Sequence, residues 1–137
     1  MEQKQAVIFE LDNCLYGVDI MRVNEIIRMV QVTPVPEADH FIEGIINLRG
    51  QVIPVVNLCR KLGLNYRDYH KDNRIIVIQS DNSKFGMIVD RVLEVSSYSD
   101  VDITPVNNVN IDTGVIDEII RIENNLCIVL KLNNLYQ

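Results

Sequence analysis

The sequence predicts a mostly β protein made of two similar small barrels that pack on each other. Three observations lead to this prediction: the kinds of apolar residue, an internal repeat, and short strand-like segments bounded by turn residues. The chain has 137 residues, near the usual size of one domain, and it contains 18 Val and 19 Ile but only two Ala. Because β-branched side chains favour strands and Ala favours helices, a helical bundle is excluded.

A repeat relates the two halves of the chain. With a shift of 69 residues, Ala6–Phe9 aligns with Ile75–Ile78, and six identities follow in the same register. A later stretch repeats with a shift of 74, so we expect an insertion in the second copy around Asp100–Asp112. Duplication explains these matches better than apolar alternation alone. The aligned segments are Asp12-Asn13 with Asp81-Asn82, Tyr16-Gly17 with Phe85-Gly86, Arg22-Val23 with Arg91-Val92, Glu25-Ile26 with Glu94-Val95, Ile45–Leu48 with Ile119–Ile122, and Val55–Leu58 with Val129–Leu132.

Each half contains two hairpins in succession. Turns are predicted where Asp, Asn or Gly interrupts the apolar segments, because these residues tolerate left-handed backbone. The predicted strands are Gln5–Leu11, Leu15–Ile20, Gly44–Leu48, Gln51–Val56, Arg74–Gln79, Phe85–Asp90, Val115–Ile122 and Leu126–Lys131. The predicted turns are Asp12-Asn13, Arg49-Gly50, Asp81–Ser83 and Glu123–Asn125. Short helical caps are predicted near Asn57–Leu62 and Leu132–Tyr136.

The connections between the hairpins differ in the two halves. Arg22–Glu25 is interpreted as one helical turn, and its counterpart Arg91–Glu94 as a strand. Thr33–Asp39 is predicted to be a crossover loop, because its two prolines cannot pair in a central strand. A second irregular stretch is predicted at Ser96–Asp112.

We expect one domain over residues 1–137, with halves at about 5–62 and 74–136 and with swapped elements at the ends. Barrels of about 65 residues bury too little surface to be stable alone. The two barrels should therefore pack against each other.

The charge balance excludes nucleic acid as a partner. The chain has 19 acidic and 13 basic side chains, a net charge of -6, and no basic stripe that could neutralise phosphates. The basic residues of Arg60–Arg74 are interrupted by Asp68 and Asp72, as in a solvated loop. No apolar run approaches the roughly 20 residues of a membrane helix, and Met1–Gln5 lacks the apolar segment of a signal peptide. We expect a cytoplasmic protein that does not insert into membranes.

The sequence contains no pattern that indicates catalysis, a metal or a cofactor. His40 and His70 lie in polar loop surroundings, and no zinc spacing, nucleophile elbow or phosphate loop occurs. Asp19 and Asp90 are offset by 71 residues, so they are not equivalent positions of the repeat. The three cysteines are too far apart for a metal or redox motif and are predicted to be buried free thiols: Cys14, Cys59 and Cys127.

Several motifs occur together along the chain, and the most specific is an Asn-Leu-Arg-Gly hairpin followed by Ile-Pro-Val-Val. The segments are Tyr16–Ile20, Val23-x-Glu25-Ile26, Gly44–Gly50, Ile53–Val56 with Leu58, and Phe85-Gly86 with Asp90 and Val92. These motifs resemble the CheW family of bacterial chemotaxis coupling proteins. The resemblance covers nearly the whole chain, from about Val7 to Tyr136.

The resemblance implies two intertwined SH3-like barrels with a hydrophobic groove between them. It also implies an adaptor without enzymatic activity or cofactor that joins the regulatory domain of the histidine kinase CheA to the cytoplasmic tips of chemoreceptors, and a monomer when alone. Ile20, Val23 and Val92 are predicted to line the receptor groove, because a helix is recognised by an apolar groove, with Glu25 and Arg49 at its rim. Kinase contacts are predicted at Ile75 and Met87.

Other interpretations of these residues remain open. Ile20, Val23 and Val92 could be core residues, and Arg49 could be a solvated turn residue. An alternative function is a sensor that binds a small molecule in the cleft between the barrels. The chain also departs from the family pattern at Asn57–Cys59 and at Glu118-Ile119, where Asp-Leu-Arg and Gly-Ile are usual.

Overall fold

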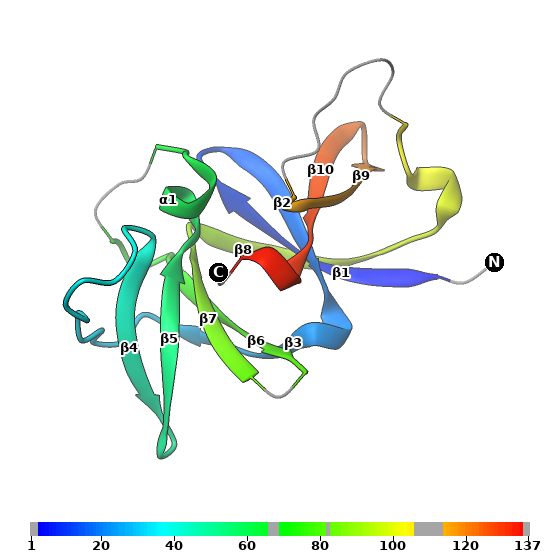
Figure 1. Cartoon of the computed structure of the whole chain (residues 1–137). Coiled ribbons are helices and arrows are strands. Elements are labelled where there is room, and N and C mark those ends of the chain that lie inside the picture. Colours follow the sequence, from blue (N-terminus) through cyan, green and yellow to red (C-terminus); the bar gives the residue numbers. More distant parts are fainter. Residues whose placement is uncertain (1–2, 66–68, 82, 106–113, 136–137) are drawn as a thin grey trace.

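The strands form two five-stranded sheets, as expected for a mostly β protein (Figure 1). This computed structural model describes residues 3–65, 69–81, 83–105 and 114–135. The first sheet has the order β8 (Arg91–Tyr98), β1 (Lys4–Leu11), β2 (Cys14–Asp19), β10 (Asn125–Leu130), β9 (Ile116–Ile122). The second has the order β3 (Val23–Arg28), β6 (Arg74–Ser80), β7 (Ser83–Val89), β5 (Gln51–Asn57), β4 (Ile42–Leu48). Short helices are η1 (Ile20–Arg22), α1 (Leu58–Leu62), η2 (Asp100–Asp102) and η3 (Leu132–Asn134).

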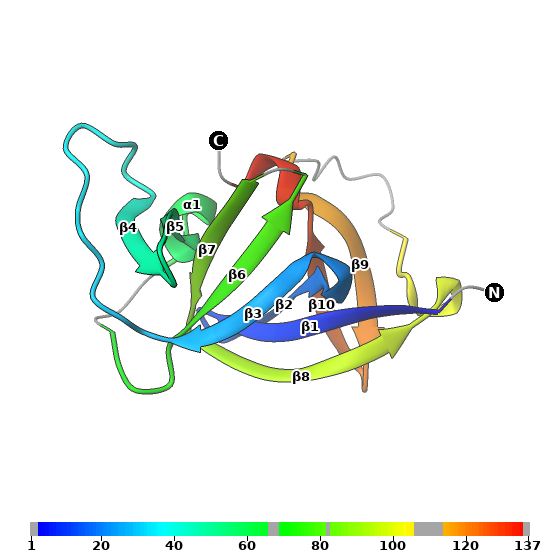
Figure 2. The same ribbon diagram turned by 90° about the horizontal axis from the view of Figure 1, so that it is seen from below.

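Each sheet closes into a small barrel, because the segment after one edge strand pairs with the other edge strand. In barrel 2 (β3–β7), Thr33 follows β3 and exchanges two backbone hydrogen bonds of 2.9 Å with Ile45 of β4. In barrel 1 (β1, β2, β8, β9 and β10), Ile103 forms a bridge to Ile120 of β9. Figure 2 shows β1 and β8 of barrel 1 side by side along one edge of the molecule, with β4, β5 and α1 at the far side.

The two barrels exchange strands between the halves of the chain. Barrel 1 combines the first two strands with the last three, and barrel 2 combines β3–β5 with β6 and β7. Counted within each repeat, both sheets have the strand order third, first, second, fifth, fourth. Equivalent parallel pairs join the repeats, with Gly17 opposite Val129 in barrel 1 and Gly86 opposite Val55 in barrel 2. The expectation of two intertwined barrels is confirmed.

Three apolar clusters form the core, one inside each barrel and a larger one between them. Strand β1 supplies two of them by alternation: Ala6 and Ile8 face the interior of barrel 1, whereas Val7, Phe9 and Leu11 face the central cluster. The largest core is therefore shared, and the barrels pack against each other as predicted.

The C-terminal helical turn belongs to this shared core. Leu132 and Leu135 join the central cluster together with Leu58 and Cys59 of α1. In Figure 1, η3 lies in the middle of the molecule, between the strands of the two barrels. Both predicted helical caps are present, and each buries apolar side chains at the junction of the barrels.

Three details differ from the sequence predictions. The helical turn predicted at Arg22–Glu25 forms earlier, as η1 at Ile20–Arg22, and Val23 begins β3, a strand that the sequence did not predict. Strand β8 continues to Tyr98, into the stretch predicted to be irregular, and residues 106–113 lie outside the described residues. Cys14 is exposed rather than buried, because it is the first residue of β2 after the Asp12-Asn13 turn.

The other two cysteines make stability depend on alkaline pH. Burial raises the pKa of Cys59 and of Cys127 to about 12, from an ordinary value of 9.0. The unfolded chain releases these protons near pH 9 while the folded chain retains them. Their contribution to stability is therefore complete below pH 9 and declines as the pH rises toward 12, by about 1.4 kcal/mol per pH unit for each thiol.

We expect the double variant Cys59→Ala/Cys127→Ala to lose stability less steeply than wild type between pH 9 and pH 11. Urea unfolding at half-unit pH steps measures the slope. Cys14→Ala is the matched control for removing a thiol, because Cys14 is exposed. An equal slope in the double variant and the wild type would contradict this assignment.

Candidate functional site

The two polar residues predicted at the receptor site are in direct contact. Arg49 donates from Nη1 to Oε2 of Glu25 at 3.2 Å and from Nη2 to Oε1, so the guanidinium and the carboxylate form a bidentate ion pair. The Arg49 side chain remains 69% exposed, and that of Glu25 is 24% exposed. The hydrogen bond from Arg49 lowers the pKa of Glu25, and the same bond raises the pKa of Arg49. The pair offers a fixed polar surface to solvent.

Local structure positions both side chains. Arg49 and Gly50 have φ values of +50° and +87°, as a two-residue hairpin turn between antiparallel strands requires, and Asn47 Oδ1 accepts a hydrogen bond from Gly50 N at 2.9 Å. Glu25 lies in β3 opposite Val77, whose side chain faces the interior of barrel 2. Because paired residues share a face of the sheet, Glu25 is directed toward the open end of that barrel. The ion pair thus joins edge strand β3 to the β4–β5 turn.

The three apolar receptor candidates lie at the margin of the central core. Ile20, Val23 and Val92 are each half-buried and pack against the central cluster. Ile20 and Val23 precede Glu25 on η1 and β3, whereas Val92 lies on β8 in barrel 1, paired with Phe9. They contribute to the core and also present apolar surface.

The kinase contacts predicted at Ile75 and Met87 disagree with the burial of these two side chains. Both side chains are 0% exposed: Ile75 packs inside barrel 2, and Met87 packs in the central cluster. A side chain without accessible surface cannot touch a partner. Both strands have the two faces buried, one by the barrel interior and one by the other barrel, so neither residue reaches solvent.

Sequence reasoning missed a set of polar residues around the ion pair. Gln79 and Lys84 pair across β6 and β7, and Gln51 begins β5. Alternation places them on the same face as the barrel 2 core residues Ile53 and Val77. We call the following five residues the barrel 2 rim: Glu25, Arg49, Gln51, Gln79 and Lys84. The period of two along the strands could have found this set, because it separates Lys84 from its buried neighbour Phe85.

The family departures are accommodated by hydrogen bonds. Asn57 caps α1, since its Oδ1 accepts from Arg60 N at 3.1 Å. Glu118 lies in β9, where it accepts a hydrogen bond from the Tyr98 hydroxyl at 2.7 Å and forms an ion pair with Lys4 at 3.3 Å. The charged residue is therefore partnered and does not disturb the closure of barrel 1.

The remaining titratable candidates have structural contacts. Asp19 accepts from Met21 N at the start of η1, and Asp90 accepts from Asp12 N at 2.8 Å. Both His40 and His70 are exposed. Within the described ranges, no three His, Cys, Asp or Glu side chains are grouped as metal ligands. No helix in the described part of the chain is both long and apolar enough to cross a membrane.

Comparison with known proteins assigns the family. Residues 5–137 match the family model described as CheW-like domain. The chain is 34% identical over 141 residues to the chemotaxis protein CheW of Treponema pallidum, covering 98% of this chain and 83% of that protein. It is 37% identical over 110 residues to CheW of Thermotoga maritima, covering 79% and 72%. The scaffolding protein TtCheW from Thermoanaerobacter tengcongensis has a structure similar to this one with a TM-score of 0.90 and 40% identity, covering 100% of this chain and 90% of that chain. By sequence and by fold, the chain belongs to the CheW family.

Proposed function

We propose that this chain is a non-enzymatic adaptor that couples chemoreceptors to the histidine kinase CheA in bacterial chemotaxis. The family match over residues 5–137 carries the proposal. The similar proteins are named chemotaxis proteins, and one is described as a scaffolding protein. A small-molecule sensor is not favoured, because none of these relatives carries such a description.

The receptor contact is proposed at Glu25 and Arg49, with Ile20, Val23 and Val92 as its apolar part. A receptor tip is helical, and a helix is bound through its apolar stripe. Polar groups at the edge of the groove then fix the orientation of the helix. Three half-buried apolar side chains and one exposed bidentate ion pair supply these two components. The interaction needs no covalent step.

The kinase contact is proposed on the regulatory domain of CheA, through barrel surface other than Ile75 and Met87. We propose that the protein is monomeric when alone and acts in the cytoplasm, where the receptor tips are. A net charge of -6 favours a soluble monomer over self-association.

We expect Arg49→Ala to weaken binding to a receptor-tip fragment by about tenfold, because arginine is enriched among the few interface residues that carry most of the affinity. The melting temperature should change little, since Arg49 lies on a solvent-exposed turn. Isothermal titration calorimetry measures the affinity and differential scanning fluorimetry checks the fold. Arg121→Ala is the matched control, an exposed arginine on β9.

A charge-swapped variant, Glu25→Arg/Arg49→Glu, separates a direct contact from a structural one. The swap can restore the ion pair within the chain but presents reversed charges to the partner. We expect it to bind the receptor fragment as weakly as Arg49→Ala. Wild-type affinity in Arg49→Ala, with a native melting curve, would refute the assignment of this site.

A further inference from the structure

The open end of barrel 2 brings two cations together on an acidic protein, with Glu25 in the rim and Asp81 in the adjoining β6–β7 turn. The barrel 2 rim holds two cations, Arg49 and Lys84, and one carboxylate, Glu25, whereas the whole chain has a net charge of -6. Arg49 is engaged by Glu25 through both Nη atoms. Lys84 is the cation that remains.

Lys84 is available to an external acid. Its Nζ donates to Oε1 of Gln51 at 3.2 Å, and no carboxylate of the described residues lies within salt-bridge distance of it. The neutral amide forms a hydrogen bond with the ammonium but no ion pair. After Arg49, Lys84 also contributes to lowering the pKa of Glu25, so the two cations act on the same small region.

The same positions in barrel 1 have the opposite charge. The counterparts of the rim residues, by the shifts of 69 and 74, include three acids and no base: Glu94 for Glu25, Glu123 for Arg49, Asn125 for Gln51, Glu10 for Gln79 and Leu15 for Lys84. Arg91, which is not one of these positions, forms an ion pair with Glu10 at 3.4 Å. Among the described residues, Glu94 and Glu123 form no ion pair. An acidic partner group would be attracted by the rim of barrel 2 and repelled by the matching end of barrel 1.

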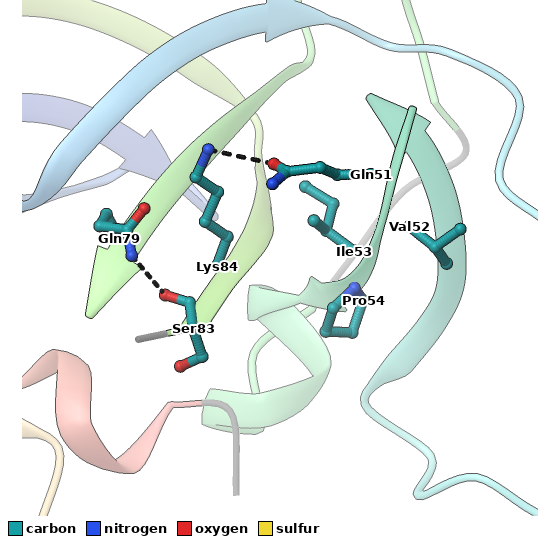
Figure 3. A pocket seen from close by; sticks show the side chains of 7 residues that line it. All are labelled: Gln51, Val52, Ile53, Pro54, Gln79, Ser83 and Lys84. Atoms are coloured by element: carbon teal, nitrogen blue, oxygen red, sulfur yellow. Dashed lines mark hydrogen bonds between the residues drawn. The ribbon is translucent and has the colours of Figure 1, made fainter. Parts of the chain in front are cut away.

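A pocket beside Lys84 gives room for such a group. It has a volume of about 560 Å³ and lies between the diverging ends of β5 and β7, which pair only from Val55 and Gly86 onward. In Figure 3, Lys84 extends across this space toward Gln51, and Gln79 donates to the Ser83 carbonyl at its other side. The Lys84 ammonium and the Gln51 amide N–H groups suit a carboxylate, whereas the Gln79 amide already donates to the Asp81 and Ser83 carbonyls.

We propose that Lys84, assisted by Gln51, binds an acidic side chain of the chemoreceptor tip at the barrel 2 rim. The inference rests on the proposed function, and it adds a specificity residue to the same receptor site. The receptor is preferred to the kinase as the source of the acid, because Gln51, which lines the pocket, lies two residues from Arg49 of the proposed receptor site. On binding, the Lys84 ammonium exchanges its hydrogen bond to the Gln51 amide oxygen for an ion pair with the carboxylate of the partner.

The test measures the affinity of a receptor-tip fragment for Lys84→Gln, Lys84→Arg and the control Lys131→Gln, an exposed lysine after β10. We expect Lys84→Gln to weaken binding about two- to fivefold at low salt, with the difference shrinking as salt rises, because an exposed ion pair is worth little and is screened. Lys84→Arg should retain affinity, and Lys131→Gln should match wild type.

Fragments in which each Glu or Asp is changed singly to Gln or Asn identify the acid. One of them should bind wild type as weakly as Lys84→Gln does, and should show no further loss with that variant. If Lys84→Gln matches Lys131→Gln while Arg49→Ala still weakens binding, the inference is overturned and the proposed function stands. If Lys84→Gln weakens only binding to the CheA regulatory domain, the assigned partner is wrong. If the wild type does not bind the receptor fragment, the proposed function itself fails.

Discussion

Phe9→Ala is expected to destabilise the whole chain by about 3–5 kcal/mol, the usual cost of removing a buried Phe side chain. Phe9 has 0% exposure and lies in the central cluster, with its ring 6.2 Å from that of Tyr16. Strands of both barrels line this cluster, including β6 and β7 of barrel 2. A cavity there removes contacts from both barrels at once, so the loss should not remain confined to the barrel that contains β1.

Chemical denaturation followed by amide NMR signals tests this expectation. Signals from β1–β2 and from β6–β7 should disappear in one transition, at a lower urea concentration than in wild type. Leu126→Ala is the control, because Leu126 is 55% exposed and its truncation should cost little. Two separate transitions, with β6–β7 unfolding at the wild-type midpoint, would show that the central cluster does not couple the barrels.

Gly44→Ala is expected to cost roughly 3 kcal/mol or more, because it combines a steric clash with backbone strain. A Cβ atom at residue 44 would lie 2.2 Å from the Thr33 carbonyl oxygen, and the residue has a φ of +152°. The same Thr33 forms the backbone bridge to Ile45 that closes barrel 2. The added methyl group therefore forces the closing segment away from β4.

Gly50→Ala provides a matched control for the backbone term. Gly50 also has a positive φ, +87°, but a Cβ atom there would meet nothing within 4 Å. Its replacement should cost about 1 kcal/mol, from left-handed backbone alone. Urea midpoints of both variants, together with hydrogen exchange at the Thr33 and Ile45 amides, measure the difference. Equal losses of stability would show that the close approach of Thr33 relaxes without cost.

Much of the local structure could be predicted from residue patterns. The chain has only two Ala and is rich in Val and Ile, so strands were expected, and turn residues at Asp12-Asn13 and Arg49-Gly50 marked two of the hairpins. These predictions succeed because β-branched residues fit a pleated surface, and because a two-residue hairpin turn needs left-handed backbone at short, recognisable positions. The motif also drew attention to Glu25 and Arg49, but it did not predict their contact, which joins residues 24 positions apart.

Burial was harder to predict, because it depends on what covers the second face of each strand. The apolar runs at Val7–Phe9 and Ile75–Ile78 fit either an exposed binding face or a doubly covered strand. In the tertiary structure both are doubly covered strands, because one face of each strand packs inside a barrel and the other packs against the opposite barrel. Ile75 and Met87 are therefore buried. Cys14 is exposed for the converse reason, as it begins its strand at a turn.

By itself, the sequence determined the strand class of this protein, its turns, its internal repeat and the two charged residues of the candidate site. Only the tertiary structure decided which strands share a barrel and which polar side chains meet at its open end. Lys84 lies 35 residues from Arg49 and 59 from Glu25, and the exchange of strands between the halves brings them to one rim. Pairing between distant strands is a property of the closed barrels, so local patterns do not reveal it.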